Sequence, residues 1–335
     1  MLLDIENEAV EIKILGAGSN WLKVSSMIAL GLTGYYSKLP KGSSVSIHTA
    51  HTGEMCLAGP KLVHEGVYHF GMTTPPWLAR LASDGRGALG FGEKPVDIRA
   101  VAVFPHFDQL ALAVRSDLGL SSLRQVVESK TPLSISTAPL HLGHPVGWTL
   151  DLLLAEYGVQ IEDFERWGGK VVFDDRQPNF LEKVPDIRTD RVTAMKSGQL
   201  NSVFDEALMT RPWKEISDAV DLTFLRIETD VLQSLEQKHG IRSSFIPKNS
   251  LRGVTQDVPT VDFAGWILYC HSELPEKLVY LTVEAIEQQA RQIETLFQPG
   301  QGLTGQIDMS VLCKNTDLAL HPGAEKYYRE HAHLN

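Results

Sequence analysis

The sequence predicts an α/β protein built from mostly parallel sheets and divided into two lobes. Short apolar runs alternate with longer amphipathic stretches, the pattern of strand–helix–strand units. The chain has 335 residues, of which 43% are hydrophobic and 21% charged, enough for two well-buried cores. The runs Ile98–Phe104 and Gln109–Arg115 are separated by only a four-residue break. Two strands joined that tightly are expected to carry the chain from one lobe into the other.

In the first third of the chain, each predicted strand except the last is followed by a predicted helix. We expect strands at Glu11–Leu15, Ser44–Ala50, Tyr68–Thr73 and Ile98–Phe104. We expect helices from the turn Gly16–Asn20 to about Tyr36, from about Gly53 to Glu65, and after Pro75 and Pro76. The strand Ile98–Phe104 is apolar at nearly every position, which is typical of a strand covered on both faces.

The rest of the chain repeats this alternation. Further strands are expected at Leu133–Thr137, Lys170–Phe173, Ser202–Asp205, Leu222–Ile227 and Val261–Cys270. Further helices are expected at Val146–Tyr157, at a segment ending in Val192–Ser197, and at Thr229–His239, Pro275–Phe297 and Pro322–His333. The helix Pro275–Phe297 is the longest of these. Its apolar residues recur at a spacing of three to four, which predicts an amphipathic helix. The last helix begins with a proline and is expected to cap the fold.

Composition excludes several classes of protein. The formal net charge is −10 and there is no basic block, so a nucleic-acid partner is not expected. No segment approaches the roughly 18 consecutive apolar residues of a membrane span. Acidic residues interrupt the opening stretch, which does not fit a secretory signal. The sequence as given therefore predicts a cytoplasmic protein, or a periplasmic one if a signal has been removed. The three cysteines have no motif spacing, so buried, unpaired thiols are expected.

A series of segments, in order along nearly the whole chain, carries a family resemblance. The segments are the turn Gly16–Asn20, the stretch Leu112–Leu123, the strand and loop Leu133–Pro139, the helix end Leu154–Gly158, and the segments Met195–Gln199, Asp257–Val261 and His321–Glu330. Together they resemble the solute receptors of TRAP transporters of the TAXI branch, within the wider type II periplasmic-binding-protein fold. The last segment is the most specific.

The resemblance implies two lobes with mixed sheets flanked by helices, joined by two hinge crossovers, with a ligand in the cleft. It implies a first lobe of residues 1–107 plus 245–335 and an inserted second lobe of residues 108–244. The implied ligand is a small organic carboxylate, and the implied partners are the membrane subunits of a TRAP transporter. The loop after Ala138 departs from the family, because His141, His144 and Pro145 stand where the family has mainly small residues.

In sheets of this kind, ligands bind beyond the carboxyl ends of strands, where helix N-termini expose free N–H groups. Four loops fit that description: Gly16–Trp21, Thr49–Glu54, Thr137–Gly147 and Asp205–Thr210. The predicted ligand-binding residues are Ser19, Asn20, Trp21, Thr52, His106, His141 and Arg211. Arg211 and Arg115 are the candidates to pair with a carboxylate, because guanidinium makes bidentate contacts. Trp21, Trp148 and Trp213 form either a stacking wall or part of the core.

No cofactor is expected. The turn Gly16–Asn20 lacks the third glycine of a dinucleotide fingerprint, and no acid ends the second strand. The pair His141 and His144 is a weak metal signal, because zinc and iron sites add a third ligand at a defined distance. Histidines that cap helices or bind a polar ligand are the simpler interpretation.

Two functions remain open, with binding preferred. The first is a solute-binding protein for a small carboxylate. The second is a cytoplasmic enzyme on the same fold, such as a decarboxylase of an aromatic acid. In that case His51, His144 and Asp205 are the candidate catalytic residues, and a histidine would protonate the carbon as carbon dioxide leaves. A cytoplasmic sensor is a third possibility.

Overall fold

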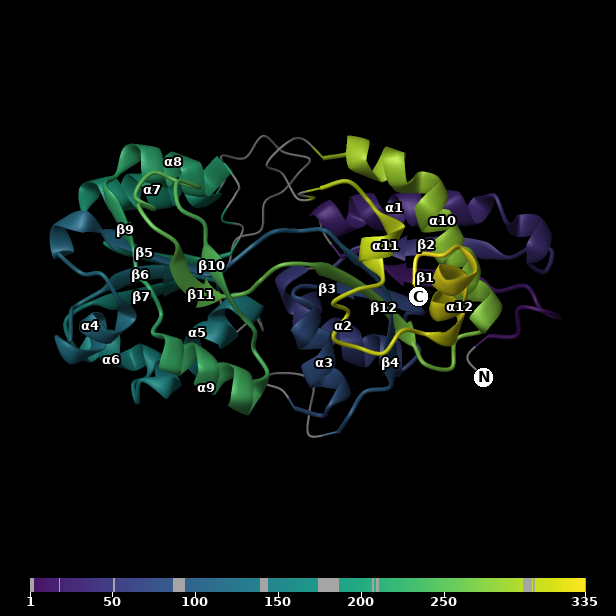
Figure 1. Cartoon of the computed structure of the whole chain (residues 1–335), viewed down its shortest axis with the longest axis horizontal. Coiled ribbons are helices and arrows are strands. Elements are labelled where there is room, and N and C mark those ends of the chain that lie inside the picture. Colours follow the sequence, from purple (N-terminus) through teal and green to yellow (C-terminus); the bar gives the residue numbers. More distant parts are fainter. Residues whose placement is uncertain are drawn as a thin grey trace. The chain divides into compact units, whose positions relative to one another are not determined.

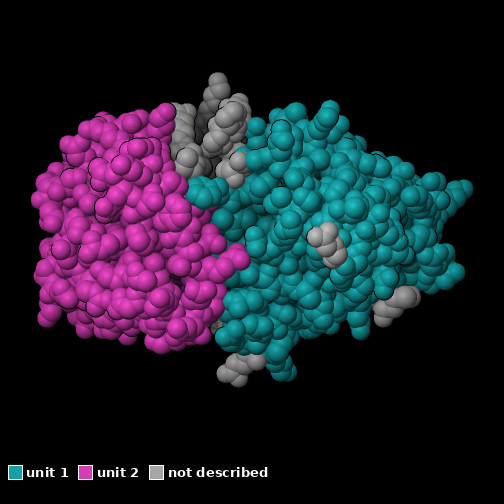
Figure 2. Space-filling model, in the orientation of Figure 1, with its two compact units in different colours: residues 1–107, 264–335 teal, residues 108–263 magenta. Residues whose placement is uncertain are grey.

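The computed structural model describes most of the chain, in two compact units. The described residues are 3–17, 19–50, 52–86, 94–138, 144–173, 187–206, 208, 211–297, 303 and 305–334. Unit 1 comprises Met1–Phe107 and Ala264–Asn335, and unit 2 comprises Asp108–Phe263 (Figure 2). Each unit has its own sheet.

The sheet of unit 1 has the strand order β2-β1-β3-β12-β4 (Figure 1). Its strands are β1 (Glu11–Leu15), β2 (Ser44–His48), β3 (Phe70–Thr73), β4 (Ile98–Phe104) and β12 (Trp266–His271). Strand β1 runs parallel to both β2 and β3, whereas β12 runs antiparallel to β3 and β4. Near the carboxyl end of β3, Thr73 lies opposite Ile267 of β12.

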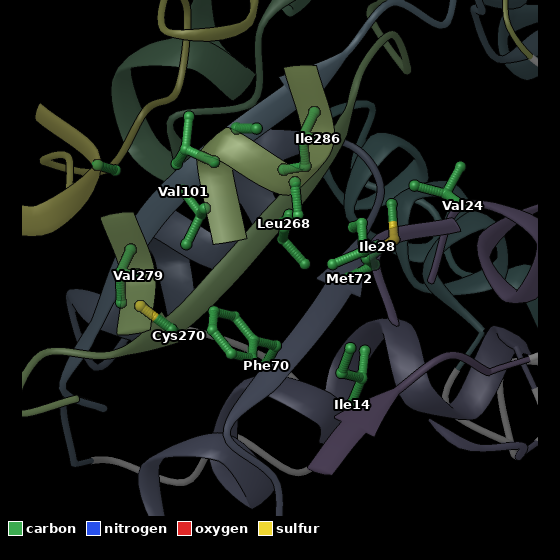
Figure 3. Close-up of a cluster of buried hydrophobic side chains, with 14 of the residues drawn as sticks. Ile14, Val24, Ile28, Phe70, Met72, Val101, Leu268, Cys270, Val279 and Ile286 are labelled. Atoms are coloured by element: carbon green, nitrogen blue, oxygen red, sulfur yellow. The ribbon is translucent and has the colours of Figure 1, made fainter. Parts of the chain in front are cut away.

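Helices cover this sheet and complete its core. They are α1 (Ser19–Thr33), α2 (Thr52–His64), α3 (Pro76–Ser83), α10 (Glu276–Thr295), α11 (Met309–Leu312) and α12 (Pro322–Glu330), with a 3₁₀ turn η1 at Tyr36–Lys38. Gly31 lets α1 approach α10 closely, because a Cβ there would lie 2.8 Å from the Cβ of Ala285. In the core, Ile28 and Ile286 of these two helices and Leu268 of β12 belong to one cluster of buried side chains (Figure 3).

The sheet of unit 2 has the order β7-β6-β8-β5-β9. Its strands are β5 (Ala111–Arg115), β6 (Ser134–Thr137), β7 (Lys170–Phe173), β8 (Ser202–Asp205) and β9 (Leu222–Phe224). Strand β6 is parallel to β7 and β8, and β5 is antiparallel to β8 and β9. A separate antiparallel pair consists of β10 (Ser243–Ile246) and β11 (Val258–Val261).

The helices of unit 2 lie between these strands in the sequence. They are α4 (Leu123–Glu128), α5 (Pro145–Glu156), α6 (Ile161–Arg166), α7 (Ile187–Ser197), α8 (Arg211–Ala219) and α9 (Thr229–His239), with a 3₁₀ turn η2 at Ser116–Leu118. Helix α9 ends at Gly240 in the left-handed conformation, as its sequence predicts.

The predicted fold class is confirmed: two mixed sheets are flanked by helices. The predicted strand Val261–Cys270 is wrong as a single element. Strand β11 ends at Val261 and β12 begins at Trp266. Between them Gly265 has φ +87°, a conformation that glycine adopts readily, and it interrupts the mostly apolar run.

The units divide after Phe263, whereas the resemblance implied a return near residue 245. The stretch between belongs to unit 2 because β10 and β11 pair with each other, and because Leu110 donates its N–H to the carbonyl of Val261 at 3.1 Å. The three cysteines are buried and form no disulfide bond with one another. Among the described helices, none combines the length and apolar character needed to cross a membrane.

Candidate functional site

Polar side chains gather at one edge of the sheet of unit 2. Strands β6 and β8 are parallel, so their last residues, Thr137 and Asp205, lie at the same edge. Strand β5 runs the other way and places its first residue, Ala111, opposite Asp205. The residues just before β5 therefore also lie at this edge. We call the following six buried polar residues the carboxyl-edge cluster: Asp108, Gln109, Ser136, Thr137, Arg191 and Asp205.

Arg191 is the charged centre of the carboxyl-edge cluster. It lies on α7 and is only 5% exposed. Its Nε donates to Oγ of Ser136 at 2.9 Å, and its Nη1 donates to Oδ2 of Asp205. The two charges are thus buried as a pair, and Asp205 is 3% exposed. Desolvating two charges costs free energy that their attraction often fails to offset, so a buried pair is a candidate for a specific role.

Two carboxylates hold the backbone at this edge. The second oxygen of Asp205 accepts the N–H of Glu206 at 2.8 Å. Oδ1 of Asp108 accepts the N–H of Gln109 at 2.9 Å and that of Leu208 at 3.0 Å. The loop after β8 is therefore bonded to the segment that precedes β5, which fixes the positions of the cluster residues.

Two members of the cluster lack hydrogen bonds from their side chains. Both polar atoms of the Gln109 amide and the hydroxyl of Thr137 are buried, and they find no partner among the described residues. A buried polar atom without a partner loses its hydration and gains nothing in return. A site that a ligand completes is one explanation for such atoms.

His144 caps the helix that follows β6. It is the N-cap residue of α5, and its Nδ1 accepts the N–H of Val146 at 3.3 Å. Pro145 occupies the first helical position, where it needs no N–H partner. This geometry agrees with the simpler interpretation of a capping histidine, and it requires that Nδ1 carry no proton.

In unit 1, the predicted site residues lie in different surroundings. Trp21 is 3% exposed and belongs to the hydrophobic core, while Asn20 is half-buried in the first turn of α1. His106 is half-buried and stacks on Trp266, with 4.7 Å between ring centroids. Desolvation lowers the pKa of His106 to about 3, so its ring is neutral near pH 7. A neutral imidazole can accept or donate a hydrogen bond but cannot neutralise an anion.

Other predicted positions are described in part or not at all. His51 and His141 lie outside the described residues. For Ser19, Thr52 and Arg211 the structure describes only the backbone, at the first residues of α1, α2 and α8. Their roles in ligand binding stay predictions.

Arg115 does not lie where a ligand arginine was expected. It is the last residue of β5, which places it at the opposite edge of the sheet from Asp205. Its guanidinium makes a bidentate contact with Asp117, at 2.7 and 3.2 Å, and donates to the carbonyl of Met195 at 3.2 Å. The ion pair with Asp117 accounts for this guanidinium.

The tryptophans proposed as a stacking wall are core residues. Trp148 is 6% exposed and Trp213 is 2% exposed. Nε1 of Trp213 donates to the carbonyl of Glu206 at 2.8 Å, and its ring packs against Phe224. Within the described part of the chain, no group of three or more histidine, cysteine or acidic side chains is arranged to hold a metal ion.

Arg191 and Gln109 were missed by sequence reasoning. Arg191 precedes the segment Val192–Ser197, where an amphipathic helix end was predicted, and a charged helical residue is ordinarily solvated. The only available signal was its spacing of four from Met195, which faces the core of unit 2. The sequence predicts Gln109 as the first residue of a strand, and nothing in its neighbours indicates that its amide is buried.

Comparison with known proteins supports the fold. The profile of the NMT1-like family matches residues 176–331. No curated protein matches the sequence. Among solved structures, XAC2383 from Xanthomonas citri, bound to chloride ion, is 10% identical with a TM-score of 0.51, and the match covers 97% of this chain and 99% of that one.

Two further solved structures are similar over almost the whole chain. MatC from Rhodopseudomonas palustris, with bound malate, is 13% identical with a TM-score of 0.49, and the match covers 96% of this chain and 97% of that one. PhnD1 from Prochlorococcus marinus, in complex with methylphosphonate, is 11% identical with a TM-score of 0.47, and the match covers 97% and 99%. At this level of identity such likeness concerns the fold alone. The chain shares its mixed α/β fold, with one helix-flanked sheet in each of two units, with XAC2383.

Proposed function

We propose that this protein is a solute-binding protein that holds a small organic carboxylate, and that Arg191 is the cation that selects it. The observation that carries the proposal is the buried Arg191, fixed by Asp205 and Ser136 at the carboxyl edge of a mostly parallel run of strands. Ligands of open α/β sheets bind at that edge. A guanidinium presents its donors in a rigid fork that matches a carboxylate.

Domain closure is the mechanism of capture that we propose. Proteins of this architecture close around a ligand by rotating two domains about the segments that connect them. A small acid would enter, meet prearranged donors, and be enclosed. A TRAP-type transporter of the TAXI branch would then receive the acid, as the sequence resemblance implies. A protein with this role returns its ligand unchanged.

The decarboxylase alternative gains no argument from the described residues. Asp205, one of its candidate catalytic groups, is bonded to Arg191 and to the backbone of Glu206. His144 accepts a backbone N–H as the cap of α5. We therefore do not propose a catalytic role for either residue.

Isothermal titration with a panel of small acids tests the proposal. The panel consists of acetate, malate, 2-oxoglutarate, benzoate and 4-hydroxybenzoate, each recovered afterwards and checked by mass spectrometry. We expect at least one acid to bind and to be recovered intact. The Arg191→Lys variant keeps the charge but loses the fork, so its affinity should fall by about tenfold or more.

Arg115→Lys is the matched control, because Arg115 belongs to the same unit but lies at the other edge of its sheet. It should bind the acid as the wild type does. Equal loss in both variants, or no binding of any acid by the wild type, would contradict the proposal. Conversion of an acid into a product would favour the enzyme.

A further inference from the structure

Gln109 has a side chain that the protein itself does not satisfy. Its residue exposure is 0%, and neither its Nε2 nor its Oε1 has a hydrogen-bond partner in the described part of the chain. The N–H groups of Gln109 and of the next residue, in contrast, both have partners. The N–H of Gln109 donates to Asp108, and the N–H of Leu110 donates to the carbonyl of Val261. No turn or helix cap near Gln109 provides a hydrogen-bond partner for its side-chain amide.

The position of Gln109 relates it to the proposed solute site. It is the second residue of unit 2, directly after the connection from unit 1. It precedes Ala111, which lies opposite Asp205 in the sheet, and Asp205 binds Arg191. The amide thus belongs to the same sheet edge as the arginine.

We propose that Gln109 is a second recognition residue, and that it binds an amide or ureido group of the solute. This inference rests on the proposed function. A primary amide has both a donor and an acceptor, and both are unpaired here. An ionised carboxylate only accepts hydrogen bonds, so it would leave Oε1 of Gln109 unsatisfied. An N–H next to a C=O satisfies both atoms at once. The solute class is therefore a carboxylate that also carries an amide or ureido group.

Two pairs of probes that differ only in that group test the proposal. N-acetylglycine is compared with 4-oxopentanoate, and N-benzoylglycine with 4-oxo-4-phenylbutanoate; each pair exchanges an N–H for a CH₂. A site built to bond an N–H rejects the analogue that lacks it. We expect the wild type to bind the amide member of at least one pair about tenfold more tightly or better, measured by isothermal titration.

The variant Gln109→Leu should bind both members of the pair with equal affinity. Gln233→Leu, at an exposed position on α9 of the same unit, should keep the wild-type preference. The melting temperature of ligand-free Gln109→Leu should equal or exceed that of the wild type, because an apolar side chain replaces an unpaired amide.

Three results would overturn the inference. The first is a wild type that binds both members of each pair equally or binds neither amide, while acids of the first panel still bind. The second is an amide preference that survives in Gln109→Leu. The third is a fall of several degrees in the melting temperature of ligand-free Gln109→Leu, which would mean that the amide already has a partner, such as a trapped water. Absence of binding to every acid would instead refute the proposed function.

Discussion

The two units share one strand order and differ in what they bury at the same edge. In each sheet, three parallel strands are followed by an antiparallel fourth strand and then an outer fifth. Thr73 at the end of β3 corresponds to Asp205 at the end of β8, since each lies opposite an early residue of the antiparallel strand, Ile267 or Ala111. Yet Oγ1 of Thr73 donates to the carbonyl of Cys56, whereas Asp205 pairs with a buried arginine.

The difference extends to the whole of each unit. In the described part of unit 1, no aspartate, glutamate, lysine or arginine is buried. In unit 2, Asp108, Arg191 and Asp205 are buried together at one edge. The same framework can therefore be completed without buried aspartate, glutamate, lysine or arginine. The topology therefore does not require the buried charges of unit 2. For this reason we propose that they take part in ligand binding.

The largest expected effect comes from removing the charge of Arg191. Arg191→Met removes the counter-charge that this arginine supplies to the buried Asp205, and it should lower the free energy of unfolding by about 3–5 kcal/mol. The double variant Arg191→Met, Asp205→Leu should recover most of that loss, because neither charge remains. Urea denaturation measures both. A single variant as stable as the wild type would show that the pair is solvated.

Acid should destabilise the protein through a histidine of unit 1. Nδ1 of His69 accepts the N–H of Lys13 at 2.9 Å, and desolvation, with a smaller effect of the Lys13 charge, lowers the pKa of His69 to about 4. In the unfolded chain the pKa of His69 is near 6.5. Above that pH the imidazole is neutral in both states, so the contribution of His69 to the free energy of unfolding is fully present. It is lost as the pH falls towards 4.

The loss for His69 alone amounts to about 3 kcal/mol at most. Urea denaturation at a series of pH values from 7.5 to 4 measures it. The variant His69→Gln has no titrating group at this position, so its stability should depend less steeply on pH. A variant profile parallel to that of the wild type would contradict this assignment.

A smaller effect, of opposite sign, is expected at Tyr269. Its buried hydroxyl finds no partner among the described residues, and it occupies space left by Gly59 and Gly71. Tyr269→Phe should therefore raise the free energy of unfolding by about 1 kcal/mol. Tyr328 is equally buried, but its hydroxyl donates to the carbonyl of Val101 at 3.1 Å. Tyr328→Phe should lower stability by a similar amount, and the same sign in both variants would refute the explanation.

The smallest effect is expected at Arg115. Its contact with Asp117 is partly exposed, and such pairs contribute about 0–1 kcal/mol. Arg115→Ala should shift the midpoint of urea denaturation only slightly. A loss comparable to that of Arg191→Met would erase the distinction between the two edges of this sheet.

Much of the fold could be predicted from the sequence, because hydrophobic periodicity and turn residues are local signals. The strands Glu11–Leu15, Ile98–Phe104, Lys170–Phe173 and Ser202–Asp205 have the predicted bounds. The predicted strand Val261–Cys270 is mostly apolar apart from Asp262, and its break at Gly265 depends on where the chain changes units.

The candidate site was less predictable. Asp205 was expected at the edge of a sheet because it directly follows an apolar strand. Its partner Arg191 comes from a different element, and no local pattern links the two residues. Strand direction is equally hidden, so the sequence could not show that Arg115 lies at the opposite edge from Asp205. Contacts between elements depend on register and direction, which a single sequence does not encode locally.

The position of β12 has a consequence for biosynthesis. This strand lies between β3 and β4, yet about 160 residues separate it from β4 in the chain. During translation, β3 and β4 therefore present unpaired edges while the whole of unit 2 is made, and such edges invite pairing with other chains. Unit 2 is continuous and can complete its sheet first. The amino-terminal unit is thus the last to be finished, and chaperones that shield exposed strands would act on it during that interval.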